Sequence, residues 1–278
     1  MKITTLIENN SSSQNLIAEH GLSLYIETEH RKILFDTGKT NLLLHNAQQL
    51  NIQIKNIDTV VISHAHYDHI GGLIPFLEQN NKATVFLKKN IFDAQYEAIR
   101  NFQKKNIGYS QELLKYRERM FFVEEPVFTL EDLIFISQIQ KQFALPKGNK
   151  SLFQNKNGNI TNDTFQHELF FIINTHRGLV LFSGCSHQGI LNFVSTAKFH
   201  FRKNIYAVIG GFHLIDNNDY TETETETEII EIAQKLKEIS PETIYYTGHC
   251  TGENAFRILL NILKNNIKKI ETGFIINL

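Results

Sequence analysis

The chain has 278 residues, of which 42% are hydrophobic and 21% charged, so it can bury one large core or two small ones. Its 28 Lys and Arg residues against 29 Asp and Glu residues give a net charge of -1. No overall field would recruit nucleic acid or an anionic membrane, and neither is expected as a partner. No apolar run approaches the roughly 20 residues that span a bilayer. Residues 1–8 alternate like a strand and do not form the apolar segment of a signal peptide. We therefore expect a cytoplasmic protein whose two cysteines, Cys185 and Cys250, stay reduced.

The first third of the chain alternates between strand and helix patterns. Residues 41–50 and 72–79 have the spacing of amphipathic helices. The apolar segments around them predict five strands, at residues 2–8, 22–27, 32–35, 59–63 and 83–87.

Residues 90–120 are predicted to be a helical insertion. Phe92, Tyr96, Ile99 and Phe102 are spaced to make one apolar stripe on a helix. The insertion could add packing at the edge of the core, or it could cap an active site. In the second case Phe92, Tyr96 and Phe102, with Phe121 and Phe122, would form an apolar roof over a substrate ring.

Residues 141–162 are rich in Asn, Gly and Lys and have little periodicity. We predict a long loop, and loops of this length often serve as lids. Lys147 and Lys150 could bind a substrate phosphate there, although lysines of a loop are more commonly only solvated.

The last third repeats the strand and helix alternation. Strands are predicted at residues 168–174, 179–183, 205–209, 243–246 and 274–277, and helices at residues 190–200, 222–239 and 253–265. The Thr-Glu repeat at residues 221–228 is interpreted as a Thr-capped, acidic helix start. Two similar series with helices between the strands predict a single α/β domain, residues 1–278, built on two sheets.

The largest group of candidate metal ligands follows the strand that is predicted to end near residue 63. His64 and His66 lie two positions apart, so in extended backbone both side chains project to one side and can share an ion. Asp68 and His69 come where Gly71 and the next glycine let the chain turn, and they can hold a second ion. Imidazole and carboxylate ligands together suit zinc, iron(II) or manganese(II).

The pattern His64-Ala65-His66-Tyr67-Asp68-His69 resembles the signature of the metallo-β-lactamase superfamily. Upstream, Asp36-Thr37-Gly38 resembles a strand end whose Asp supports a metal-binding His without binding the metal itself. Downstream, Cys185 replaces the superfamily's bridging Asp, and His249 matches its last His ligand. The resemblance implies a four-layer αβ/βα sandwich with the metal site at one edge between the sheets.

Four segments together narrow the resemblance to the branch named for dihydropterin–ribofuranosylaminobenzene phosphate synthase. They are the segments at residues 19–23, 184–190, 210–214 and 248–252. The branch's named reaction joins an aromatic amine to a dihydropterin and releases pyrophosphate. The same fold hosts many chemistries, so function must be argued from the site.

Two divalent ions are expected, with zinc favoured and manganese or iron as alternatives. We assign one ion to His64, His66 and His187 and the other to Asp68, His69 and His249. The third ligand of the first ion is open, because His167 occupies the region where the superfamily usually carries it. Cys185 could contact an ion, line the pocket or be packed as a structural residue.

The remaining candidates would serve the substrate. While bound to metal, Asp68 could orient a water molecule or accept its proton, and His213 could donate a proton or hold a substrate oxygen. His20 would lie on the rim of the site, and a structural role is the alternative for both histidines. We expect an enzyme that acts on a small molecule carrying phosphate or pyrophosphate, with a generic metal-dependent hydrolase of phosphodiesters, lactones or thioesters as the first alternative. A metal-binding sensor without turnover is the second alternative.

Overall fold

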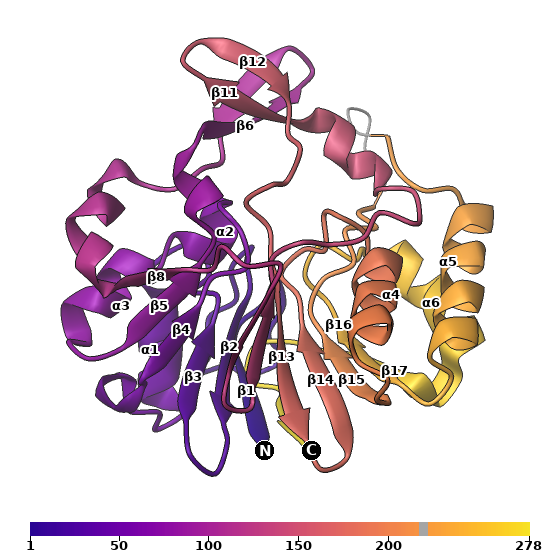
Figure 1. Cartoon of the computed structure of the whole chain (residues 1–278), viewed down its shortest axis with the longest axis horizontal. Helices are drawn as coiled ribbons and strands as arrows, with labels where there is room; N and C mark the ends of the chain where they lie inside the picture. Colours follow the sequence, from indigo (N-terminus) through magenta and orange to yellow (C-terminus); the bar gives the residue numbers. More distant parts are fainter. Residues whose placement is uncertain (217–221) are drawn as a thin grey trace.

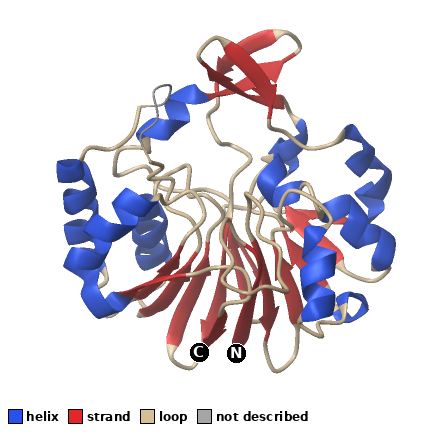
Figure 2. Cartoon of the chain, turned by 180° about the vertical axis from the view of Figure 1, so that it is seen from behind, coloured by secondary structure: helices blue, strands red, loops and turns tan. Residues whose placement is uncertain are grey.

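The computed structural model describes residues 1–216 and 222–278. Two seven-stranded sheets face each other, and helices cover the outer face of each (Figures 1 and 2). The first sheet has the order β18 (Ile275–Asn277), β1 (Lys2–Ile7), β2 (Ser23–Glu27), β3 (Lys32–Phe35), β4 (Thr59–Val61), β5 (Thr84–Leu87) and β8 (Met120–Phe122). The second has the order β17 (Ile267–Lys269), β16 (Ile244–Thr247), β15 (Ile205–Ile209), β14 (Gly178–Phe182), β13 (Phe170–Thr175), β10 (Leu133–Ile136) and β9 (Val127–Leu130).

The helices divide between the two sheets. Helices α1 (Leu42–Gln49) and α3 (Leu73–Gln79) pack on the first sheet. Helices α4 (Ile190–His200), α5 (Glu226–Ile239) and α6 (Glu253–Leu263) pack on the second. The short helix α2 (Tyr67–Ile70) lies in the loop after β4. This arrangement confirms the predicted αβ/βα sandwich. No helix among the described residues has the length and apolar character that crossing a membrane requires.

Both faces of the central strands are buried, which explains their nearly continuous apolar sequences. In β3, Ile33 and Phe35 point between the sheets while Leu34 points to the helices. In β14, Val180 and Phe182 face the inter-sheet core. The two-residue repeat of a strand therefore divides each sequence between two apolar layers.

The helical prediction for residues 90–120 is wrong for the central part of the segment, and both ends form 3-10 helices where α-helix was expected. The segment forms a hairpin, β6 (Gln95–Arg100) and β7 (Gln103–Asn106), flanked by the 3-10 helices η2 (Lys89–Phe92) and η3 (Gln111–Arg119). Strand β6 pairs with β11 (Leu152–Lys156), more than 50 residues further along the chain. Because this partner is remote, the local spacing of apolar residues did not reveal the strand.

The predicted loop at residues 141–162 is also largely structured. It contains the 3-10 helix η4 (Lys147–Ser151) and the hairpin of β11 with β12 (Asn159–Asn162). Asn157 and Gly158 form the turn with positive φ angles of 55° and 89°, so the sequence Asn-Gly was an overlooked hairpin signal. The four strands β12, β11, β6 and β7 make a third sheet, which we call the cap sheet. Figure 1 shows it above the edge of the two large sheets where α2 lies.

The predicted apolar roof is wrong for its outer members. Phe102 lies at the tip of the β6–β7 hairpin and is fully exposed. Phe121 stacks on Phe128 and belongs to β8, the edge strand of the first sheet next to β5. Tyr96 alone of this group has its ring against a candidate, 4.3 Å from the ring of His167.

The acidic helix start after the Thr-Glu repeat has the predicted cap. Thr225 is the N-cap of α5 and forms a capping box with Glu228. Thr221, where the repeat begins, lies outside the described residues. Two further 3-10 turns, η1 (Ile54–Asn56) and η5 (Lys264–Asn266), complete the described elements.

The inter-sheet core predicts a large stability cost for Phe171→Ala. The ring of Phe171 is fully buried and lies 5.3 Å from that of Phe135 and 5.4 Å from that of Phe182. Its removal should lower the free energy of unfolding by about 3–5 kcal/mol, measured by denaturant titration. Phe199→Ala, at a ring that is 65% exposed, should change it by less than about 0.5 kcal/mol. Equal losses in the two variants would contradict the assigned core.

Candidate metal centre

The candidate ligands converge at the carboxyl ends of the parallel strands. His64, His66, Asp68 and His69 follow β4, whereas Cys185 and His187 follow β14 and His249 follows β16. Parallel strands end at the same edge of their sheet, and here β4 belongs to the first sheet whereas β14 and β16 belong to the second. The corresponding edges of the two facing sheets therefore bring three separate segments to one place. All of these side chains are buried, with exposures between 0% and 7%. Gly184 permits the contact between segments, because a Cβ there would lie 2.2 Å from Ser63 Oγ.

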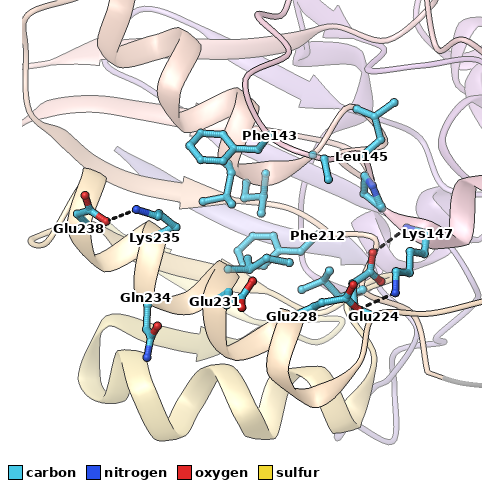
Figure 3. Close-up of a pocket in the computed structure, with 17 residues that line it drawn as sticks. Phe143, Leu145, Lys147, Phe212, Glu224, Glu228, Glu231, Gln234, Lys235 and Glu238 are labelled. Carbon is cyan, nitrogen blue, oxygen red and sulfur yellow. Dashed lines mark hydrogen bonds and ion pairs between the residues drawn. The ribbon is translucent and has the colours of Figure 1, made fainter.

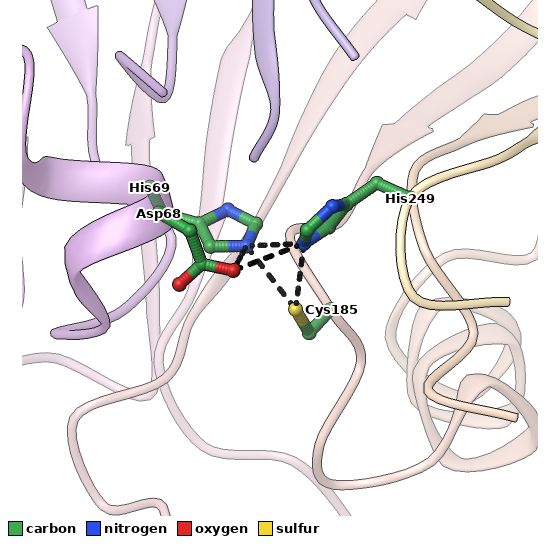
Figure 4. Close-up of side chains that lie close together, drawn as sticks. All are labelled: Asp68, His69, Cys185 and His249. Atoms are coloured by element: carbon green, nitrogen blue, oxygen red, sulfur yellow. Dashed lines mark hydrogen bonds and ion pairs between the residues drawn. The ribbon is translucent and has the colours of Figure 1, made fainter. Parts of the chain in front are cut away.

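Four side chains surround one point (Figure 4). His69 Nε2 lies 3.1 Å from His249 Nε2 and 3.1 Å from Cys185 Sγ. Asp68 Oδ2 lies 3.3 Å from His249 Nε2. Ligand atoms of a tetrahedral zinc ion are about 3.3–3.8 Å apart, so these side chains would have to separate by only a few tenths of an ångström to hold a cation.

The outer nitrogens of the two histidines fix their tautomers. His69 Nδ1 donates to Asp36 Oδ2 at 2.7 Å, and His249 Nδ1 donates to Asn9 Oδ1 at 2.8 Å. When the rings are neutral, imidazoles bonded in this way present Nε2 lone pairs to each other. Two such lone pairs need a positive charge between them. A proton would satisfy one contact, whereas a metal ion would satisfy all four groups.

The charges of this set favour cation binding. Although burial opposes it, the carboxylates of Asp36 and Asp68 raise the pKa of His69. Burial lowers the pKa of His249 to about 4, so this imidazole is neutral at neutral pH. Burial also opposes ionisation of Asp68, but the surrounding imidazoles outweigh it and hold the pKa of this carboxyl well below its usual range.

Ligand atoms of His64 and His187 lie within 4.8 Å of each other and of Cys185 Sγ, whereas His66 is grouped in this way with Asp163 and His167. The structure therefore brings the predicted ligands of this ion together only in part. We call His64, His66 and His187 the second set. The Nε2 atom of each is buried and has no hydrogen-bond partner among the described residues. Their ring centroids lie 4.7–4.9 Å apart. Burial, reinforced by neighbouring imidazoles, holds the pKa values of His64 and His187 well below their usual range, so both are neutral. Three unpartnered buried nitrogens are costly unless a ligand satisfies them.

Hydrogen bonds at Nδ1 also orient two of these rings. Ser63 Oγ donates to Asp36 Oδ2 at 2.7 Å, so it accepts from His64 Nδ1 at 2.8 Å. His187 Nδ1 donates to Asn149 Oδ1 at 3.0 Å. In both rings the Nε2 lone pair is then the free one. Cys185 Sγ lies within 4.8 Å of ligand atoms in both sets, a position suited to a bridging ligand.

His167 is placed differently from His187. Its Nδ1 accepts from the amide of Ala65 at 3.1 Å, and its Nε2 donates to Asp163 Oδ2 at 2.9 Å. With both nitrogens engaged, His167 would have to give up a hydrogen bond to bind an ion. His66 Nε2 lies 3.7 Å from the same carboxylate, so Asp163 links the two rings.

The predicted substrate-binding histidines lie beside the two sets. His213 has its ring 4.2 Å from that of His187, and neither of its nitrogens has a partner among the described residues. His20 Nε2 lies 3.2 Å from Asp68 Oδ2, and its side chain is 54% exposed. His20 therefore connects the buried centre with the surface.

The predicted phosphate-binding lysines are held elsewhere. Lys147 Nζ pairs with Glu228 at 2.7 Å and Lys150 Nζ with Glu222 at 2.5 Å. Lys147 lines a cavity of about 500 Å³ between residues 143–147 and α5, and no candidate ligand lines that cavity (Figure 3). The acidic start of α5 satisfies both ammonium groups, so their geometry does not support substrate binding at the metal centre.

Several residues that orient the ligands escaped the sequence analysis. Glu168 accepts from the backbone amides of His187 and Gln188, each at 2.8 Å, and burial raises its pKa to about 8. Asn149, Asp163 and Asn9 each bond a histidine of the centre. Glu168 adjoins His167 in sequence and Asp163 precedes it by four residues. Asn149 and Asn9 lie outside the motifs and gave no local signal.

Residues 17–136 match the Metallo-beta-lactamase superfamily, and relatives in that superfamily match nearly the whole chain, so the chain belongs to it. It is 31% identical to the 7,8-dihydropterin-6-methyl-4-(beta-D-ribofuranosyl)-aminobenzene-5'-phosphate synthase of Methanocaldococcus jannaschii, over 99% of this chain and 96% of the relative. This similarity confirms the predicted resemblance to that branch.

Solved structures agree on the fold. A crystal structure of a metal-dependent hydrolase of the beta-lactamase superfamily superposes with a TM-score of 0.84 at 30% identity, covering 100% of this chain and 99% of the other. A diphosphatase of the PhnP family superposes with a TM-score of 0.55 at 15% identity, covering 99% and 96% of the two chains. At that identity the second likeness concerns the fold alone.

The tautomers predict which histidine completes the second set. His187→Ala should lower the divalent metal bound per chain about as much as His64→Ala, because each removes a free Nε2 lone pair. His167→Ala should lower it much less, since both nitrogens of His167 already have partners. Elemental analysis of the purified variants measures the metal. The reverse order of loss would assign the ligand to His167.

The set of Asp68, His69, Cys185 and His249 predicts a similar dependence on Asp68. Asp68→Asn keeps the size of the side chain but removes its charge, so metal content should fall at the position shared with His69 and His249. His45→Ala, on helix α1, is the control and should retain the wild-type metal content. Unchanged metal in Asp68→Asn would show that the four convergent groups do not hold an ion.

Proposed function

We propose that this chain is an enzyme that holds two divalent ions, zinc first among them, and acts on a small molecule carrying a phosphate or pyrophosphate group. The observation that carries the proposal is the convergence of buried imidazole lone pairs on Cys185 from two sides. The name of the Methanocaldococcus relative includes a phosphate, and that relative matches nearly the whole chain.

Each of the two sets of side chains would hold one ion. His64, His66 and His187 would hold one ion, and Asp68, His69 and His249 the other, with Cys185 between them. Bound there, the ions would attract anionic oxygens of the substrate and lower the pKa of a bound water. Every further role falls to the chain's own side chains.

Those side chains orient the ligands and face the substrate. Asp36 and Asn9 hold His69 and His249 with Nε2 turned inward, so the centre needs no reorganisation when it is loaded. His213 is a neutral, unpartnered imidazole that could donate to a substrate oxygen. His20 would guide the anion past Asp68.

The substrate would approach from the side of His20. A hollow of about 360 Å³ lies there, lined by His20, Cys250, Phe256 and others, beside the backbone of His249. Phe256 offers an aromatic face in this hollow, whereas the predicted roof of Phe102 and Phe121 lies elsewhere.

A metal-dependent hydrolase is the second candidate function. The crystal structure with a TM-score of 0.84 is of a protein named as such, and it is 30% identical to this chain. The same parts serve either reaction, because both need the anion held and a leaving group stabilised. The two reactions differ only in whether water or an amine attacks.

Competition by simple anions tests the proposed substrate class. Inorganic pyrophosphate should inhibit turnover of any substrate found more strongly than chloride or acetate does, because two ions would bind its oxygens. The measurement is an inhibition constant for each anion with the metal-loaded protein, and Asp68→Asn should abolish the turnover. Turnover of lactones or thioesters without inhibition by pyrophosphate would refute the phosphate-directed proposal.

Labelled water separates the two candidate reactions. In water enriched in oxygen-18, hydrolysis would place the label in the product, whereas condensation with an aromatic amine would consume the amine and leave the product unlabelled. His45→Ala serves as the control for protein handling in both assays.

A further inference from the structure

The two cysteines of the chain meet beside the metal centre. Cys185, Cys250 and His213 each offer a ligand atom, and these three atoms lie within 4.8 Å of one another. The residues follow three neighbouring parallel strands, β14, β16 and β15. Both cysteines are free thiols.

The ring nitrogens of His213 lack hydrogen-bond partners among the described residues. Its side chain is buried, with 6% exposure, and neither Nδ1 nor Nε2 has a hydrogen-bond partner in residues 1–216 and 222–278. A neutral imidazole carries one donor and one lone pair, and burying both without partners is costly.

Cys250 occupies a space that the chain leaves for its sulfur. A Cβ at Gly211 would lie 2.5 Å from Cys250 Sγ, so only glycine leaves room at that position. The thiol makes one weak contact, to the carbonyl oxygen of Cys185 at 3.7 Å. Cys250 is half-buried and lines the hollow beside His20, so ions in solution can reach it.

The donors of this cluster are softer than those of the two sets described above. Two sulfurs and one imidazole select thiophilic ions such as zinc, cadmium or copper(I) over manganese or magnesium. Asp68, with its hard oxygen, takes no part. The cluster would therefore discriminate between ions that the rest of the centre accepts alike.

We propose that Cys185, His213 and Cys250 form a third, sulfur-rich ion position that takes thiophilic ions and shares Cys185 with the proposed two-ion centre. Each thiol loses its proton to solvent as its sulfur binds the ion, so loading releases protons and oxidises nothing. The proposal rests on the two-ion function only through the shared Cys185, and Cys250 reports on the third position alone.

Thiol protection by cadmium tests the proposal on the full, reduced wild-type chain. Cadmium should slow alkylation of both cysteines by at least about tenfold, read separately for each by mass spectrometry of the digested protein. It should also produce thiolate-to-cadmium absorption that falls by about half in Cys250→Ser, since one of the two sulfur ligands is gone. Alkylation of Cys250 at the same rate with and without cadmium would overturn the proposal.

Matched variants separate this position from the two-ion centre. His213→Ala should weaken the protection of Cys250, whereas Asp68→Asn should leave it in place while losing manganese binding. If the wild-type chain bound no manganese while cadmium still protected Cys250, the result would contradict the two-ion function and leave the third position supported. Melting temperatures of Cys250→Ser and Cys250→Ala, matched to wild type, exclude misfolding as the cause of lost absorption.

Discussion

The carboxylate of Asp36 is the constraint on which the candidate centre depends. One oxygen accepts from the amide of Ser63, and the other accepts from Ser63 Oγ and from His69 Nδ1, all at 2.7 Å. Through Ser63 the same carboxylate sets the orientation of His64. One buried side chain thus fixes the free nitrogen of a ligand in each set. Asp36 itself has a left-handed backbone, with φ of 54°, and such strain is typical of functional sites.

The rest of the architecture brings the ligands to that carboxylate. The segments after β3 and β4 leave the first sheet, and those after β14 and β16 leave the second. They meet where these edges of the two sheets face each other, although they are up to 213 residues apart in the chain, from Asp36 to His249. The apolar core between the two sheets holds them in a fixed position relative to each other beneath the ligands. The cap sheet then contributes from above, because η4 adjoins β11 and carries Asn149, which orients His187.

Sequence patterns predicted the elements whose conformation depends on residues close to them in the chain. The strands, the helices of both halves and the His-x-His-x-Asp-His segment were predictable, since each depends on neighbouring residues and on a resemblance carried by short motifs. The cap sheet was not, because β6 owes its strand conformation to β11, a partner that spacing within residues 90–120 cannot reveal. Lys147 and Lys150 were misjudged for a related reason: the acidic residues that hold them lie more than 70 positions away. The Asn157-Gly158 turn was visible in the sequence and would have predicted half of that sheet.

The central claim is that the buried lone pairs are arranged for cations and not for a shared proton. The most direct measurement is anomalous X-ray diffraction at the zinc edge from crystals grown with zinc and washed free of excess metal. The account predicts one peak among Asp68, His69, Cys185 and His249, a second among His64, His66 and His187, and a third at the proposed sulfur-rich position of Cys185, His213 and Cys250. Diffraction that shows ordered side chains without a peak between His69 and His249 would mean that a proton bridges these rings, and it would contradict the account.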